Sequence, residues 1–123
     1  MAWEFKDNAP IYTQLIEKIK YKIISGEYKV GEKLPSVREL AAEATVNPNT
    51  MQRALAELEK MGLIYSVRTS GRYITEDTQM INEIKEVLAK EEIKEFLNKM
   101  QKIGIKKGEI VDSLKKVIEE GEK

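Results

Sequence analysis

The stretch GEKLPSVRELAAEATVNPNTMQRALAELEKMGLI, residues 31–64, predicts two helices separated by a tight turn. Ser36 and Glu39 form an S-x-x-E capping box, which starts a helix whose apolar pattern continues to about Ala44. Asn47 is a favourable N-cap for the second helix, and a Met-Gly pair is expected to end it. Two short helices joined in this way indicate a helix-turn-helix.

The flanking segments extend this pattern to a winged helix-turn-helix. A helix is predicted over residues 9–25, where isoleucine and leucine recur every four residues. A short strand at residues 33–34 follows, and residues 63–67 and 72–75 are predicted to form the two strands of a hairpin, the wing. The expected fold is therefore mostly α with a small β-hairpin, and residues 1–75 are predicted to be the DNA-binding domain.

Residues 76–123 are predicted to form a helical dimerisation tail of two helices. Apolar residues lie at helical spacing from Met80 to Ile103, Gly104 interrupts the pattern, and a last amphipathic helix ends near Gly121. The first apolar stripe either packs on its own domain or pairs with a second subunit. We favour pairing, because an extended amphipathic helix must bury its stripe; whether the last helix packs in cis or in trans stays open. The predicted dimer interface comprises Met80, Ile84, Val87, Leu88, Phe96, Leu97 and Met100.

The composition argues against several classes of protein. The chain contains no cysteine and no histidine, which removes disulfides, thiolate metal sites, cysteine nucleophiles and the usual general base. We therefore expect no enzymatic activity, no metal and no cofactor. The first ten residues lack the apolar core of a signal peptide, and no apolar run approaches the roughly 20 residues of a membrane helix. A cytoplasmic protein without membrane partners is expected.

The charge distribution gives little information about the partner. The net charge is zero, from 21 basic and 21 acidic residues. Residues 1–75 carry 11 basic and 9 acidic side chains, or +2, and residues 76–123 carry the remaining 10 and 12, or −2. DNA binding requires a local basic face and not a basic protein, so this balance does not exclude it.

The start of the second helix of the helix-turn-helix carries side chains suited to the major groove of DNA, which admits one α-helix. Asparagine and glutamine pair with adenine edges, and arginine pairs with guanine or with phosphate. Arg38 lies in the first turn of the preceding helix, where a cation opposes the helix dipole and so needs a partner. That partner is Glu39, Glu43 or, in the reading we prefer, DNA.

The tip of the hairpin has small residues between Arg68 and Arg72, which let the backbone approach a phosphate or the minor groove. Taken by itself, this pattern fits an ordinary surface hairpin with two solvated arginines equally well. The predicted DNA-contacting residues are Lys33, Ser36, Arg38, Asn47, Asn49, Thr50, Gln52, Arg53, Arg68, Thr69, Ser70, Gly71 and Arg72.

Residues 10–75 resemble the DNA-binding domain of the GntR family of bacterial regulators. The runs GEKLPSVRELA, ALAELEKMGLI and VRTSGRYI carry the resemblance. The resemblance implies that DNA is contacted by Arg38, by the wing and by the start of the second helix of the helix-turn-helix, which is called the recognition helix. The short tail resembles that of the YtrA subfamily, in which it serves dimerisation, and this suggests a repressor. Two departures concern Asn47-Pro48-Asn49, where the family often has serine or threonine and arginine, and Thr69, which replaces the first glycine of an R-G-x-G wing.

Three functions remain open after the sequence is considered alone. The leading one is a homodimeric DNA-binding regulator that recognises a palindromic operator. The second, favoured by the zero net charge, is a winged-helix module that binds a partner protein. The third is a sensor in which Phe96, Met80, Met100 and Tyr73 line an apolar pocket for a small-molecule effector, although an interface core is the preferred reading of these residues.

Overall fold

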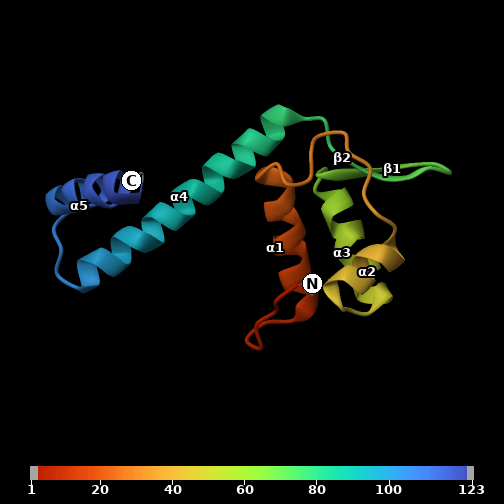
Figure 1. Ribbon diagram of the computed structural model, residues 1–123, viewed down its shortest axis with the longest axis horizontal. Coiled ribbons are helices and arrows are strands. Elements are labelled where there is room, and N and C mark those ends of the chain that lie inside the picture. The colour runs from red at the N-terminus through yellow and green to blue at the C-terminus, as the bar shows by residue number, and fades with distance from the viewer. Residues whose placement is uncertain (1–2, 122–123) are drawn as a thin grey trace. The chain divides into compact units, whose positions relative to one another are not determined.

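The computed structural model describes residues 3–121, which form five helices and one two-stranded sheet (Figure 1). The predicted fold class, mostly α with a small β-hairpin, is confirmed. The chain divides into two compact units, of which the first ends at Ile84 and the second begins at Lys85. The elements in chain order are α1 (Ile11–Ile24), α2 (Val37–Ala44), α3 (Pro48–Lys60), β1 (Ile64–Val67), β2 (Gly71–Ile74), α4 (Thr78–Lys102) and α5 (Lys107–Gly121).

The helix-turn-helix, α2 and α3, begins where its sequence signals predict. Ser36 Oγ accepts a hydrogen bond from the Glu39 N–H, and the Glu39 carboxylate accepts one from the Ser36 N–H, each at 3.2 Å. Asn47 Oδ1 accepts a hydrogen bond of 2.8 Å from the Asn49 N–H and caps α3, with Pro48 at the first helical position. These side chains satisfy backbone donors that a helix start leaves without intrahelical partners.

The core of the first unit lies between α1 and α3, which pack on each other over more residues than any other pair of helices in the described chain. Leucine, isoleucine and methionine side chains from both helices are almost fully buried there, and each contributes roughly 1.5–3 kcal/mol by leaving water. Leu15, Ile19 and Ile23 of the predicted stripe of α1 are buried, whereas Ile11 at the start of the helix is 43% exposed. The most deeply buried side chains are Leu15, Ile19, Ile23, Leu40, Met51, Leu55, Leu58, Leu63, Ile64 and Ile74.

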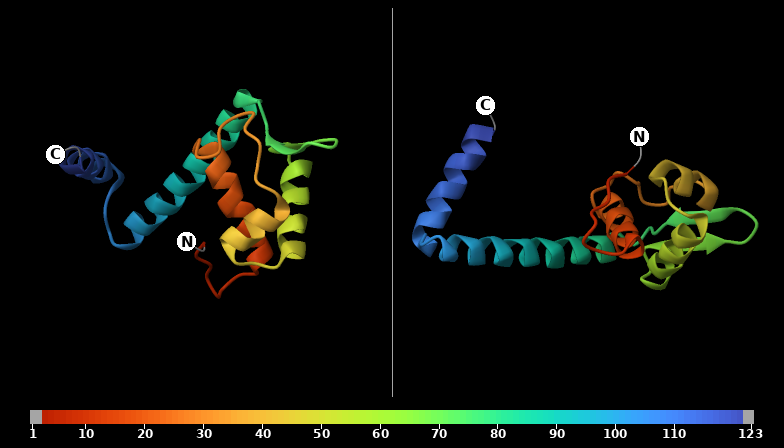
Figure 2. Two further views of the ribbon diagram at one scale, coloured as in Figure 1. Left: turned by 45° about the vertical axis from the view of Figure 1, so that its right-hand side comes forward. Right: turned by 90° about the horizontal axis from the view of Figure 1, so that it is seen from below.

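The wing is an antiparallel pair of strands in which Tyr65 lies opposite Tyr73 and Val67 opposite Gly71. It projects from the helices of the first unit, as the two views of Figure 2 show. The predicted short strand at residues 33–34 is reduced to one bridge between Lys33 and Tyr73, and the neighbouring Leu34 N–H donates a 2.8 Å hydrogen bond to the Arg72 carbonyl. The segment before α2 is thereby joined to the inner strand of the wing.

The second unit contains the end of α4, a turn at Gly104 with a φ of +84°, and α5. Phe96 and Met100 of α4 line an apolar hollow of about 280 Å³ together with Ile105 and residues of α5. Ile110 is buried, whereas most other apolar side chains of α5 are exposed. No helix within residues 3–121 combines the length and apolarity needed to cross a membrane.

The residues predicted for the dimer interface are mostly half-buried in the single chain. Val87 is exposed, and the others are partly covered by their own unit. Met80 packs in the first unit beside Gly62, where an added Cβ would lie 3.6 Å from the Met80 sulfur. Their pairing with a second subunit stays a prediction.

Candidate nucleic-acid interface

The outward face of α3 is polar along its first two turns. Met51, Ala54, Leu55 and Leu58 are buried on the inner face. The side chains on the opposite face of these first two turns include four that were predicted to contact DNA. Thr50 is half-buried, and the exposed ones are Asn49, Gln52 and Arg53.

All four arginines of the chain lie between residues 38 and 72, in the helix-turn-helix and the wing. Within residues 3–121, Arg38, Arg53 and Arg68 form no ion pair with a carboxylate. For Arg38 this removes Glu39 and Glu43 as the local partner that the helix dipole would call for. One cation each on α2, on α3 and on the wing thus has no carboxylate partner in the described part of the chain.

Arg53 contacts an aromatic ring. Its guanidinium carbon lies over the ring of Tyr12, 4.6 Å from the ring centroid. Tyr12 lies in the first turn of α1, next to the buried stripe but outside it, so the periodicity of the sequence did not identify it. A contact between residues so far apart in the chain depends on how α1 crosses α3.

Arg72 differs from the other three arginines. Its Nε atom is buried and lies 3.5 Å from Oε1 of Glu59 on α3. The same oxygen of Glu59 accepts a 2.6 Å hydrogen bond from the Ser66 hydroxyl of β1. Arg72 was predicted to contact DNA from the wing, but the structure places its side chain against the recognition helix, where it joins the wing to α3.

The wing tip is a tight turn stabilised by its own hydrogen bonds. The Ser70 N–H donates to the Val67 carbonyl at 3.0 Å, and the hydroxyls of Ser70 and Tyr73 share a hydrogen bond. The Tyr73 ring stacks on that of Tyr65, with centroids 5.7 Å apart. Thr69 has a φ of +66°, a conformation that favours glycine at the third position of a turn.

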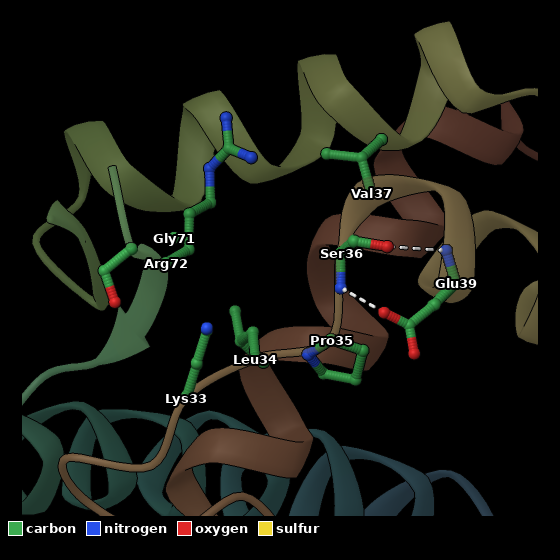
Figure 3. Close-up of a pocket in the computed structure, with 9 residues that line it drawn as sticks. Lys33, Leu34, Pro35, Ser36, Val37, Glu39, Gly71 and Arg72 are labelled. Atoms are coloured by element: carbon green, nitrogen blue, oxygen red, sulfur yellow. Dashed lines mark hydrogen bonds between the residues drawn. The ribbon is translucent and has the colours of Figure 1, made fainter. Parts of the chain in front are cut away.

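A groove of about 630 Å³ separates the wing from the start of α2 (Figure 3). One wall is formed by residues 33–37 with the capping box of Ser36 and Glu39, and the other by residues 70–72. Lys33 extends between them, and a Cβ added at Gly71 would lie 3.2 Å from the Lys33 Cε atom. The groove therefore brings together the predicted residues of the α2 start and of the wing, and glycine at position 71 leaves room for the lysine.

A helix with a polar outward face, a bracing helix before it and a basic hairpin after it define a winged helix-turn-helix, a class of DNA-binding protein. The model of the GntR family of bacterial regulatory proteins matches residues 11–74. The chain belongs to this family and is a DNA-binding transcriptional regulator.

Relatives match over nearly the whole chain. The uncharacterized HTH-type transcriptional regulator YhcF of Bacillus subtilis is 36% identical over 118 residues, which cover 96% of this chain and 98% of YhcF. The HTH-type transcriptional repressor YtrA of the same organism is 35% identical over 113 residues, which cover 91% of this chain and 87% of YtrA. The resemblance to YtrA predicted from the tail is thus confirmed at the level of sequence, and these relatives are regulators.

Solved structures agree with the fold. A GntR family transcriptional regulator from Listeria monocytogenes has a TM-score of 0.82 and 46% identity, covering 91% of this chain and 98% of that one. The structure of AraR(DBD) in complex with operator ORX1 has a TM-score of 0.54 and 26% identity, covering 61% of this chain and 95% of that one. The AraR domain in that structure is bound to operator DNA.

Proposed function

We propose that the chain represses transcription by binding a two-fold symmetric operator as a homodimer. The observation that carries this proposal is that Arg38, Arg53 and Arg68 form no ion pair with a carboxylate within residues 3–121. These cations lie on α2, on α3 and on the wing, the elements that contact DNA in a winged helix-turn-helix. A buried or paired set would instead indicate a structural role.

The contacts divide by chemistry. Asn49 and Gln52, exposed on the first turns of α3, read base edges in the major groove. Arg38 and Arg53 bind guanine or phosphate on either side of them, and Lys33, Arg68 and the small residues of the wing bind the backbone. Arg72 contributes by holding the wing against α3.

Dimerisation through α4 and α5 would bury apolar surface that the single chain exposes. Val117, Ile118 and Val87 are 65%, 58% and 54% exposed, a pattern that a lone soluble helix pair rarely shows. The hollow of about 280 Å³ at Phe96 and Met100 is lined mostly by apolar side chains, which suits apolar side chains of a second copy. A two-fold dimer presents two copies of α3 to a palindromic site.

The repressor role is supported by the relative YtrA, a transcriptional repressor that aligns with 91% of this chain. Operator binding is supported by the AraR complex, whose protein shares the winged helix. A regulator of this size represses most simply by occupying the DNA that the polymerase needs.

A footprint on the DNA upstream of the gene, repeated at two salt concentrations, tests the proposal. A symmetric protected site whose affinity falls steeply with salt is expected, because each neutralised phosphate releases a counterion. Light scattering should give twice the chain mass of 14.1 kDa. Binding no stronger than to random DNA, or a monomer on the protected site, would contradict it.

A further inference from the structure

Tyr12 and Arg53 form the one cation–π contact between α1 and α3 among the described residues. The guanidinium carbon lies 4.6 Å from the centroid of the ring. Arg53 is exposed on the outward face of α3, so the ring is the support on which its charged end rests. Tyr12 itself is outside the set of residues predicted to contact DNA.

The first turn of α1, which carries Tyr12, forms hydrogen bonds with the segment that precedes the helix. Pro10 offers no side-chain cap, and the Gln14 side chain instead ties the segment before α1 to the first turn of the helix. The Gln14 side-chain amide donates to the carbonyls of Lys6 and Ala9 at 2.8 and 2.7 Å, and its oxygen accepts from the Lys6 N–H at 2.8 Å. The Thr13 hydroxyl donates to the Pro10 carbonyl at 2.9 Å. The first turn of α1, which carries the ring, is therefore tied to residues 6–10 by four side-chain hydrogen bonds.

A support of this kind matters for an arginine because its long side chain otherwise samples many rotamers. Contact with the face of a ring leaves N–H donors of the guanidinium available for an anion or for a base edge. Within residues 3–121 no carboxylate forms an ion pair with Arg53. The guanidinium is thus restrained without being neutralised.

We propose that Tyr12 is a positioning residue for Arg53: it holds the guanidinium ready for DNA and so contributes to operator affinity and discrimination. This inference rests on the proposed function, because it requires that Arg53 contacts DNA. Tyr12 acts through Arg53 and needs no contact of its own with the duplex.

A purely structural role for Tyr12 in the packing of α1 must be separated from positioning. The core below it is formed by fully buried side chains such as Leu15 and Ile19, whereas Tyr12 is half-buried, so variants at position 12 should fold. Tyr12→Phe keeps the ring, Tyr12→Leu removes it, and Tyr12→Gln is a second ring-free variant suited to a partly exposed helix position. Each is made with Arg53 and with Arg53→Ala.

The probe is a duplex selected from a random-sequence library by the wild-type protein. With Arg53 present, Tyr12→Leu and Tyr12→Gln should weaken binding roughly three- to tenfold, and Tyr12→Phe less than about twofold. In the Arg53→Ala background the same substitutions should have no further effect, because there is no guanidinium left to position. Urea unfolding of each variant reports on the structural role separately.

Arg68→Ala is the matched control, since it removes a cation of the wing that has no contact with Tyr12. Losses from Tyr12→Leu and Arg68→Ala should add. Equal losses from Tyr12→Leu with and without Arg53, or unchanged binding with Arg53 present, would overturn the inference alone. Failure of the wild-type protein to select any sequence would overturn the proposed function and this inference together.

Discussion

Nε of Arg72 lies 3.5 Å from Oε1 of Glu59, so that β2 of the wing is joined by an ion pair to the recognition helix α3. The same carboxylate accepts the hydroxyl of Ser66 on β1, and it therefore contacts both strands. This ion pair distinguishes Arg72 from Arg68 at the other end of the hairpin, which forms no ion pair within residues 3–121.

Glu59→Ala should destabilise the first unit by about 1–2 kcal/mol, because it removes the partly exposed ion pair with Arg72 and the hydrogen bond from Ser66. Urea unfolding measures the change. Glu57→Ala on the same helix is the control, since Glu57 forms no ion pair within residues 3–121. Equal stability of the two variants would show that the ion pair does not hold the wing.

Arg38→Ala should separate DNA binding from stability. Loss of a base contact would cost roughly 1–3 kcal/mol of binding free energy. The free energy of unfolding should stay the same or rise by a few tenths of a kcal/mol, because a cation near the start of α2 opposes the helix dipole. A mobility shift on the selected duplex and urea unfolding give the two values. A parallel fall in both would indicate a structural role for Arg38.

Tyr28 should make the first unit sensitive to alkaline pH. Burial, followed by the negative charges of Glu43, Glu27 and Glu32, raises the pKa of Tyr28 to about 12 from an ordinary value of 10.0. The unfolded chain loses this proton first, so stability is intact below pH 10 and falls as the pH rises toward 12. The loss is on the order of 3 kcal/mol at most, because one pKa unit corresponds to about 1.4 kcal/mol.

Tyr28→Phe supplies the comparison for that experiment. Because phenylalanine has no proton to lose, the variant should show a shallower decline in stability above pH 10. Unfolding by urea at a series of pH values, with phenolate absorbance followed in the wild-type protein, gives both quantities. Identical pH profiles for the two proteins would contradict the raised pKa.

Thr45→Asn should stabilise the protein. Thr45 follows α2 with a φ of +59°, a left-handed conformation in which a β-branched residue is strained and asparagine is tolerated. A gain of about 0.5–1 kcal/mol in the free energy of unfolding is expected. Thr45→Val, which is also β-branched, should bring no gain. A gain from valine equal to that from asparagine would point to a cause other than the backbone.

Local sequence signals predicted the positions of the helices and strands well. The capping box of Ser36 and Glu39 and the cap at Asn47 act over two or three residues, so the sequence contains all the atoms involved. The positive φ at Thr69 agrees with the glycine that the family often has there. Most helix and strand ends were predicted closely for the same reason. Helix α1 begins at Ile11, one residue after Pro10, whereas it was predicted to begin at residue 9.

Two contacts between side chains of the candidate site could not be predicted from the sequence. Tyr12 meets Arg53, and Glu59 meets Arg72, only after α1 has crossed α3 and the hairpin has folded onto the helix. No periodicity or motif specifies those crossings. The prediction included Arg53 on α3 and Arg72 on the wing among the DNA contacts, but it did not find that Arg53 rests on a ring and that Arg72 is paired with Glu59.

The cap at Asn47 also limits what this side chain can recognise. Its oxygen already accepts from the Asn49 N–H, which fixes its orientation and leaves one lone pair, while both hydrogens of the amide NH₂ stay available to donate. The paired donor-and-acceptor contact to adenine needs that oxygen as well. Under the proposed function we therefore expect Asn47 to donate to oxygen atoms of the sugar-phosphate backbone, and base discrimination to depend on the residues that follow it.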